Sequence, residues 1–158
     1  MALRAFSTQD YSLLIHWIDS EKLNYQWGGP SFNFPLDVTQ IDEHYNQANV
    51  FPFIFVVKGT EAGFVELFKV SDTHFRICRV FVSEHFRGQG IAKLMLANLI
   101  TLAKQSYRAE VLSLAVFNTN TIAKRCYESL GFVETALEKG ERSWDGQVWD
   151  LITMEMRC

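Results

Sequence analysis

Two glycines in a short polar turn are the residues of this chain best suited to binding an anion. Gly88 and Gly90 follow an apolar stretch that ends at Val82 and precede a helical stretch that begins at Ile91. Exposed amides at the start of a helix carry about half a positive charge and attract phosphate. Glycine lets the backbone come close to a diphosphate, and Arg87 can add a charge-assisted bond to the same anion. The turn therefore predicts a diphosphate site.

Three other roles of a glycine turn compete with a diphosphate site of this kind, and the turn lacks what two of them require. A dinucleotide fingerprint requires a third small residue three positions after Gly90, where Lys93 stands, and it requires a parallel unit before the turn. A Walker-type loop requires Gly-Lys followed by Ser or Thr, which the turn lacks. A structural turn without any ligand is the third alternative, so the surrounding residues have to decide.

The first fifty residues are expected to supply a strand and two helices. The pattern of apolar residues predicts a short strand at 2–6 and a helix from about residue 8 to 18. Glycines and prolines mark a loop at 28–35. Thr39, with an acid three residues later, is typical of a capping box and predicts a helix to about residue 47.

The rest of the chain is expected to form six strands and two helices. Aromatic and β-branched residues bounded by turn residues predict strands at 53–58, 62–70, 73–82, 111–117, 136–144 and 148–156. Helical spacing predicts helices at 91–105 and 121–130. The order βααβββαβαββ gives an α/β class with a mixed sheet and helices on its faces. No repeat or linker interrupts the chain, so we expect one domain over residues 1–158.

Two motifs together resemble the GNAT superfamily of N-acetyltransferases. Its Arg/Gln-x-x-Gly-x-Gly/Ala motif after a strand is matched by Arg87-Gly88-Gln89-Gly90-Ile91-Ala92. A second match consists of Asn120, Ala123, Tyr127 and then Gly131-Phe132. The resemblance covers nearly the whole chain. It implies the acyl-CoA N-acyltransferase fold, a sheet splayed between the fourth and fifth strands, and acetyl-CoA as cosubstrate.

The resemblance also assigns residues to the cofactor. The pantetheine arm would lie between the strands ending at Val82 and Phe117, bonded by backbone groups of Phe81 and Val82 in a form of strand addition. A bulge near Arg79-Val80 would aim an amide at the thioester oxygen.

The diphosphate would be held by residues of the glycine turn. These are the amides from Gln89 and Gly90 through Ile91 to Ala92, together with Gly88 and Arg87. The Asn120 side chain would bond the pantetheine arm, and capping of the helix that begins at Thr121 is an alternative compatible with that role.

Tyr127 is the residue that the resemblance places at the cofactor sulfur, where it would protonate the departing thiolate. A core tyrosine on the inner face of the helix is the alternative. The neighbouring Cys126 could suggest a covalent acyl-enzyme, but no His stands in sequence context to activate it. We therefore expect direct attack of an amine on the thioester.

Glu66 is the leading candidate for the base that deprotonates the amine. It interrupts the apolar stretch 62–70, where an unpaired charge would be costly. Edge exposure or an ion pair with a nearby arginine such as Arg79 would account for it equally well, and water could be the base. Glu84, beside the glycine turn, is typical of a surface residue.

Charge and weak likenesses point to a small cationic amine as acceptor. Residues 1–50 hold six acids and two bases, a net charge of −4, whereas residues 51–158 hold 12 acids and 13 bases. Opposite potential steers a charged ligand, although a solvated acidic surface is the simpler interpretation. The tryptophans at 17 and 27 faintly resemble those of aminoglycoside 6'-N-acetyltransferases, and polyamines and ribosomal-protein N-termini stay open. Trp144 and Trp149 could close the acceptor pocket or bury the final hairpin.

Composition limits the classes of protein to which the chain can belong. The chain is 48% hydrophobic and 21% charged with a net charge of −3, as in soluble globular proteins, and it has no basic stripe for nucleic acid. Its apolar runs are shorter than the ~20 residues of a membrane helix, and the N-terminus lacks signal-peptide features. Three scattered cysteines favour a reducing cytoplasm, and scattered histidines predict no metal. An acetyl-CoA sensor without turnover, an interaction protein that keeps only the fold, and a homodimer all stay open.

Overall fold

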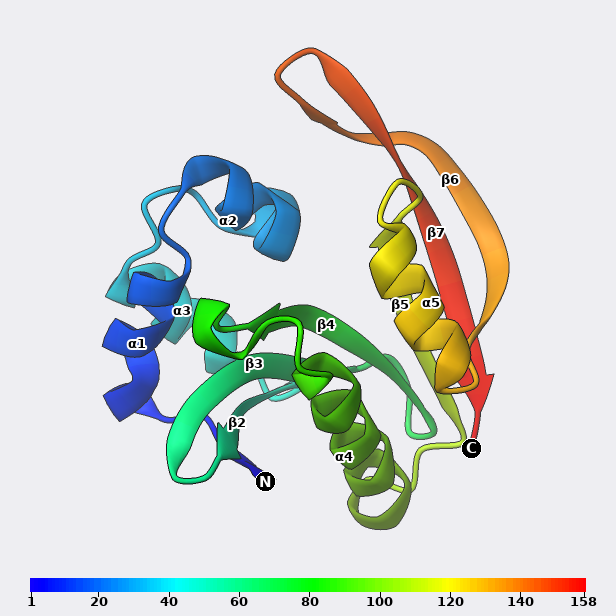
Figure 1. Cartoon of the computed structure of the whole chain (residues 1–158), viewed down its shortest axis with the longest axis horizontal. Coiled ribbons are helices and arrows are strands. Elements are labelled where there is room, and N and C mark those ends of the chain that lie inside the picture. Colours follow the sequence, from blue (N-terminus) through cyan, green and yellow to red (C-terminus); the bar gives the residue numbers. More distant parts are fainter.

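A single sheet of seven strands organises the structure (Figure 1). The computed structural model describes residues 1–158 except for the side chain of residue 141. Its strands are β1 (Ala2–Ala5), β2 (Val50–Val57), β3 (Thr60–Lys69), β4 (His74–Val82), β5 (Val111–Phe117), β6 (Val133–Trp144) and β7 (Gln147–Arg157). The spatial order is β1-β2-β3-β4-β5-β7-β6. All neighbours are antiparallel except β4 and β5, which are parallel.

The parallel pair separates after a short contact. β4 and β5 are paired only where residues 74–76 of β4 meet residues 111–113 of β5. From there β5 stays paired with β7 as far as Phe117 opposite Leu151. The carboxyl ends of β4 and β5 therefore diverge, which confirms the expected splay and the mixed α/β class.

Helices cover both faces of the sheet, because the strand residues alternate between two cores. Phe64 and Phe81 face a cluster with α1 (Tyr11–Trp17), α2 (Glu21–Gly28) and α3 (Val38–Tyr45). Val65 and Leu67 face a second cluster with α4 (Ile91–Ser106) and α5 (Thr121–Ser129). Figure 1 shows α4 and the α1–α3 group on opposite sides of β2–β4. Within the described residues, no helix combines the length and apolarity needed to cross a bilayer.

The N-terminal region differs from the sequence prediction at two points. The structure has a third helix, α2, in a segment for which no element was predicted. Its cap is Ser20, whose side chain accepts a bond from the Leu23 amide at 3.2 Å. The cap of α3 is Asp37 and not Thr39, because Asp37 has an extended backbone and its carboxylate accepts from the Gln40 amide at 2.9 Å.

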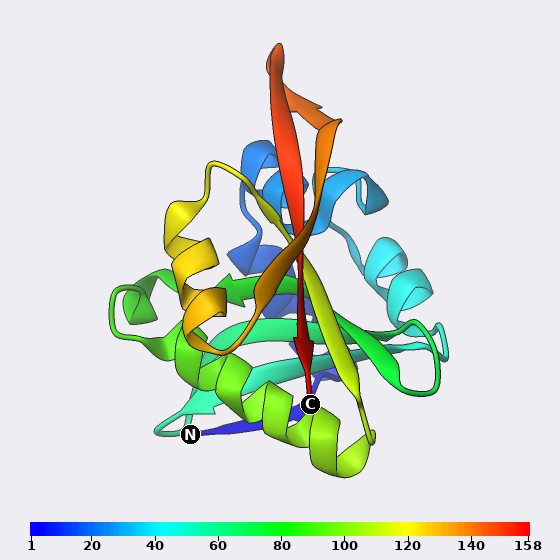
Figure 2. The ribbon, with the colours of Figure 1, turned by 90° about the vertical axis from the view of Figure 1, so that its right-hand side faces the viewer.

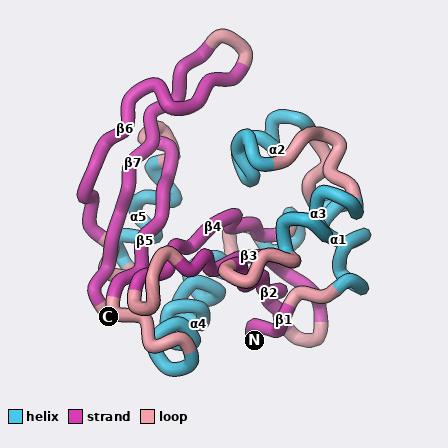
Figure 3. The backbone as a smooth tube through the Cα atoms, turned by 180° about the vertical axis from the view of Figure 1, so that it is seen from behind, coloured by secondary structure: helices cyan, strands magenta, loops and turns pink.

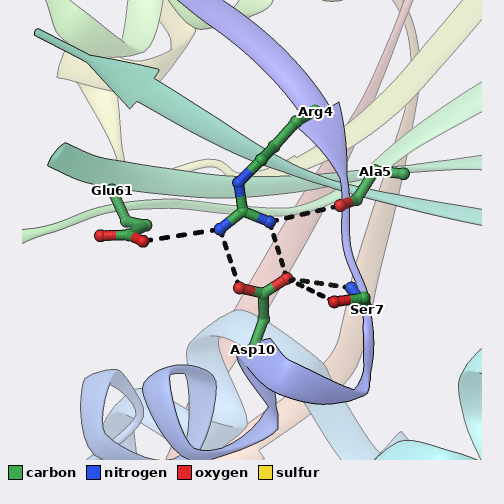
Figure 4. Close-up of polar contacts among 5 residues, drawn as sticks. All are labelled: Arg4, Ala5, Ser7, Asp10 and Glu61. Carbon is green, nitrogen blue, oxygen red and sulfur yellow. Dashed lines mark hydrogen bonds and ion pairs between the residues drawn. The ribbon is translucent and has the colours of Figure 1, made fainter. Parts of the chain in front are cut away.

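An ion pair ties β1 to the short 3-10 helix Thr8–Asp10 (Figure 4). The Asp10 carboxylate accepts two bonds of 2.8 Å from the Arg4 guanidinium and one of 2.9 Å from the Ser7 amide. Asp10 is only 5% exposed. The bond to Arg4 is the largest cause that holds the pKa of Asp10 below its ordinary value, against the opposing effect of burial. This acid of the N-terminal third therefore has a structural role.

The C-terminal hairpin extends away from the rest of the molecule. Figure 2 shows the far end of β6 and β7 projecting beyond the helices. The turn is formed by Asp145 and Gly146, both at positive φ, as a two-residue hairpin turn of type I′ requires. The projecting end faces α2 across the side of the sheet where β4 and β5 diverge (Figure 3).

Candidate active site

A cavity of about 420 Å³ lies where β4 and β5 diverge. Four parts of the fold form its walls: α2, the carboxyl end of β4, the end of β5 with the loop that follows, and the start of β7. The lining residues are Lys22, Leu23, Gln26, Trp27, Val80, Phe81, Phe117, Thr119, Asn120, Gln147 and Trp149. The splay of the sheet thus opens a space that reaches from the ends of β4 and β5 to α2 and the C-terminal hairpin.

A β-bulge in β4 borders this cavity. Phe64 of β3 is opposite Phe81, but Glu66 is opposite Cys78, so β4 carries one extra residue between these pairs. Arg79 lies in the left-handed region with φ of 53°. A non-glycine residue in such a conformation costs on the order of 1–3 kcal/mol and persists only where its surroundings hold it. The bulge predicted near Arg79-Val80 is confirmed, and it turns the backbone at the cavity wall.

The glycine turn has the backbone that an anion cradle needs. Gly88 and Gly90 both have φ of 75°, and a Cβ at either position would meet no atom within 4 Å. Gly90 is the cap of α4, so the amides of residues 89–92 open a 16-residue helix. Open space and free helix-start amides fit a diphosphate.

The side chains of this turn bond to nearby backbone. The Arg87 Nε donates to the carbonyl of Val82 at 3.0 Å, and its guanidinium carbon lies 5.5 Å from the centroid of the Phe81 ring. Gln89 Nε2 donates to the carbonyl of His85 at 3.0 Å. Glu84 is exposed in the 3-10 helix Glu84–Phe86, as expected of a surface residue.

Asn120 both caps α5 and lines the cavity. Its Oδ1 accepts from the Ala123 amide at 3.2 Å, which is the capping alternative predicted from the sequence. Among the described residues, no bond engages its Nδ2. The side-chain amide therefore keeps a donor at the cavity wall.

Tyr127 lies in the core face of α5, 8% exposed, with its ring 6.1 Å from that of Phe132. It does not belong to the residues that line the cavity. Burial, and then the Cys126 side chain, raise the pKa of Tyr127 to about 12. The hydroxyl therefore keeps its proton at neutral pH and is able to act as a donor, while its contact with cofactor stays a prediction.

The surroundings of Cys126 do not activate it as a nucleophile. It is half-buried, and burial raises the pKa of its thiol, against a smaller lowering by Lys93. A thiol with a raised pKa is mostly protonated at neutral pH and is a weak nucleophile. The described residues also contain no group of three or more His, Cys, Asp or Glu that could hold a metal ion.

Glu66 is fully buried and has partners on both carboxylate oxygens. Oε1 pairs with Nη1 of Arg79, and Oε2 lies 3.2 Å from Nε2 of His44. This is the ion pair with Arg79 that the sequence offered as the alternative to catalysis. Glu66, like Tyr127, is absent from the residues that line the cavity.

The acids of the N-terminal third are divided between structural and exposed positions. Asp10 pairs with Arg4, Asp37 caps α3, and Asp42 accepts from the Tyr11 hydroxyl at 2.9 Å. Glu21 is exposed at the start of α2, next to the cavity residue Lys22.

Sequence reasoning missed the contribution of α2. The Tyr25 ring packs at a tilt against those of Trp144 and Trp149, with centroids 5.5 and 5.8 Å away, and its hydroxyl accepts from the Ser143 amide at 3.1 Å. α2 and the hairpin are thereby joined across the cavity. The spacing of Lys22, Leu23, Gln26 and Trp27 along one helical face was the signal that could have identified this wall.

Comparison with known families and structures agrees with this geometry. A sequence model described as "Acetyltransferase (GNAT) family" matches residues 15–132, which is well over half of the chain. A protein of Bacillus subtilis subsp. natto (strain BEST195) described as "Probable spermine N(1)-acetyltransferase" is 35% identical over 54 residues. That match covers 34% of this chain and 36% of the relative, so the chain matches about a third of that protein's length.

Solved structures share the fold over the whole chain. A spermidine N-acetyltransferase from Vibrio cholerae in complex with CoA and spermine superposes with a TM-score of 0.85 at 20% identity, covering 99% of this chain and 94% of that one. A ribosomal-protein-alanine N-acetyltransferase from Brucella melitensis gives a TM-score of 0.79 at 20% identity, covering 100% of both chains. At such identities the likeness establishes the fold alone.

Proposed function

Because the chain belongs to the acetyltransferase (GNAT) family, we propose that it is an N-acetyltransferase that moves an acetyl group from acetyl-CoA to a primary amine. We take residues 1–158 as one catalytic domain. The observation that carries the proposal is the cavity between the diverging ends of β4 and β5, with the bulge of β4 in its wall.

The residues around the splay fit the cosubstrate. The backbone of Phe81 and Val82, which lies beyond the part of β4 that pairs with β5, would bond the pantetheine arm, and the free donor of Asn120 would bond it from the other side. The helix-start amides of residues 89–92 would hold the diphosphate. Arg87 would exchange its bond with the Val82 carbonyl for a charge-assisted bond to phosphate.

The chemical step is a direct transfer. Acetyl-CoA supplies the acetyl group as a thioester, and the neutral amine nitrogen forms a bond to its carbonyl carbon while the bond from carbon to sulfur breaks. An amide of the bulge stabilises the charge that develops on the carbonyl oxygen. Tyr127 gives its proton to the departing thiolate, since its raised pKa keeps the hydroxyl protonated.

For the base we favour water over Glu66. Both oxygens of Glu66 are engaged and the side chain is fully buried, so removal of the amine proton by Glu66 would have to break an ion pair. Water in the cavity reaches the amine without that penalty. We propose a different role for Glu66 below.

We propose a small cationic amine, such as a polyamine, as the acceptor. The spermine and spermidine acetyltransferases among the similar proteins support this class. The exposed acid Glu21 beside the cavity and the aromatic rings of Trp27 and Trp149 in its wall support it as well, because aromatic faces attract cations. Lys22 also lines the cavity, so we expect the distal ammonium groups of the acceptor to lie away from it.

The test is a screen for release of the CoA thiol from acetyl-CoA with separate amines. Spermidine, spermine, aminoglycosides, amino acids and N-terminal peptides form the panel. We expect turnover with polyamines above all other classes. Turnover with peptides alone would show that the acceptor is a protein N-terminus and not a polyamine. Tight binding of acetyl-CoA without turnover on any amine would show that the protein is a sensor and not an enzyme.

A further inference from the structure

Arg79 is held at the bulge by three different elements. Its guanidinium pairs with Glu66 of β3, and its guanidinium carbon lies 5.2 Å from the centroid of the Phe32 ring. Its backbone carbonyl accepts a bond of 3.0 Å from the indole Nε1 of Trp27 in α2. A residue at a positive φ needs such restraints, because its conformation is unfavourable by itself.

The buried Glu66 carboxylate holds the Arg79 side chain through an ion pair. It is fully buried on the face of β3 that packs under α3, and the Arg79 side chain is 13% exposed. Each carboxylate oxygen has its own partner, one on Arg79 and one on His44. Removing one member of a buried ion pair leaves an uncompensated charge, so the pair fixes the Arg79 side chain in one place.

Trp27 connects the bulge with the acceptor side of the cavity. Its side chain is 7% exposed, packs against Phe32 and Phe64, and belongs to the cavity lining. The same indole that borders the acceptor space therefore bonds the carbonyl of the bulged residue.

We infer that Glu66 and Trp27 are positioning residues that act through Arg79 to fix the bulge of β4, and that they thereby aim its amide at the thioester oxygen. The anchoring of the bulge is a property of the protein alone. Its effect on the thioester rests on the proposed function. The two parts are tested separately.

The first experiment measures amide hydrogen exchange at Arg79 and Val80 in the protein without any ligand. Trp27→Phe keeps an aromatic ring and removes the donor to the Arg79 carbonyl. Loss of one net hydrogen bond predicts exchange roughly five- to tenfold faster at these amides. The matched control is Trp17→Phe, because Trp17 packs on the neighbouring Phe81 ring at 5.3 Å between centroids. Unchanged exchange in Trp27→Phe, or an equal increase in the control, would overturn the anchoring.

The second experiment measures the infrared carbonyl stretch of acetyl-CoA labelled with carbon-13 at the thioester. A positioned amide lowers this frequency in the wild-type complex. In Trp27→Phe and in Glu66→Gln we expect the band to move back toward its position in water and kcat to fall about a hundredfold, as a misplacement near 1 Å would cause. The Kd for CoA, which has no acetyl group, should stay within twofold.

The pH profile separates positioning from proton removal. If Glu66 positions the bulge, Glu66→Gln lowers kcat/KM at every pH and leaves the shape of the profile unchanged. A profile that loses its acidic limb in this variant would make Glu66 the base and overturn the inference. A wild-type protein that binds no acetyl-CoA would instead refute the proposed function, while the exchange experiment would still decide on the anchor.

Discussion

Tyr127 is a core residue for which we propose a chemical role as well. Its ring belongs to the core, and burial raises its pKa to about 12. The hydroxyl is then protonated over the whole pH range in which an amine becomes neutral, so we expect the rate to rise with pH and to show no falling limb from this residue below pH of roughly 10.

Replacement of this tyrosine tests its proton. Tyr127→Phe keeps the ring and removes the hydroxyl, so kcat should fall by roughly 10²–10⁴ while the Kd for acetyl-CoA stays within a factor of about two. Tyr107→Phe is the matched control, because Tyr107 is also a partly buried core tyrosine with a raised pKa. Normal turnover by Tyr127→Phe in steady-state assays would remove this residue from the mechanism.

Asp10 provides a pH-dependent contribution to stability. Its pKa is lowered in the folded protein, chiefly by the bond to Arg4. A lowered pKa stabilises the fold above the unfolded value near 4, and this stabilisation is lost as pH falls through the folded value.

The variant Asp10→Asn should therefore be less stable at pH 7 by about 1–2 kcal/mol. The difference from wild type should shrink at about pH 3, where the unfolded-state carboxyl is protonated. Urea denaturation at both pH values measures it. Asp72→Asn, at a 96% exposed side chain that pairs with Lys69, is the control and should change little. An equal loss at both pH values would contradict the assigned cause.

At the scale of elements, the turn before α4 can bind a diphosphate only if its glycines carry no side chain. Gly90→Asp places a Cβ at φ of 75° and a negative charge where phosphate is expected. We predict that the Kd for acetyl-CoA rises about a hundredfold, as loss of charge-assisted bonds implies.

Gly59→Asp is the matched control for this substitution. Gly59 has φ of 77° in the turn between β2 and β3, and a Cβ there meets nothing within 4 Å. Both variants should lose similar thermal stability, and calorimetric titration should show weakened binding only for Gly90→Asp. Retained affinity in Gly90→Asp would refute the cradle.

Elements with a strong local pattern were predictable and those defined by tertiary contacts were not. The strand 111–117 was predicted at its observed bounds, because it is a β-rich run between turn residues. α2 was missed because it has few apolar residues and ends in two glycines, one of which still belongs to the helix. Tertiary hydrogen bonds hold it in place. Trp27 donates to the carbonyl of Arg79, far along the chain, and Asn24 donates to the carbonyl of Phe32 across a loop.

The site shows the same division. The bulge of β4 followed from the resemblance. The partners of Glu66 did not, because His44 lies on α3 and Arg79 on β4. No sequence spacing fixes such a contact, so the choice between a catalytic and a paired carboxylate needed the fold.

At the scale of the whole molecule, the cavity depends on two distant parts that meet through Tyr25. The hairpin projects from the sheet (Figure 2). It contacts α2 through the rings of Tyr25, Trp144 and Trp149. Tyr25→Ala should raise the KM for the amine roughly tenfold through the loss of two aromatic contacts. The Kd for acetyl-CoA should not change, because the contacts of Tyr25 are with the hairpin and not with the glycine turn.

A milder variant distinguishes the ring from the hydroxyl. Tyr25→Phe keeps both ring contacts and loses only the bond from the Ser143 amide, so its KM should lie between those of wild type and Tyr25→Ala. Initial-rate kinetics with the best amine of the screen measure this order. A KM for Tyr25→Ala equal to that of wild type would mean that the hairpin does not form the acceptor wall.

The most direct test of the central claim is a crystal structure of the wild-type protein with CoA bound. We predict that the diphosphate accepts bonds from the amides of residues 89–92 and that the pantetheine arm lies between β4 and β5. A diphosphate bound away from the start of α4, or a pantetheine arm outside the diverging strands, would contradict the proposed site.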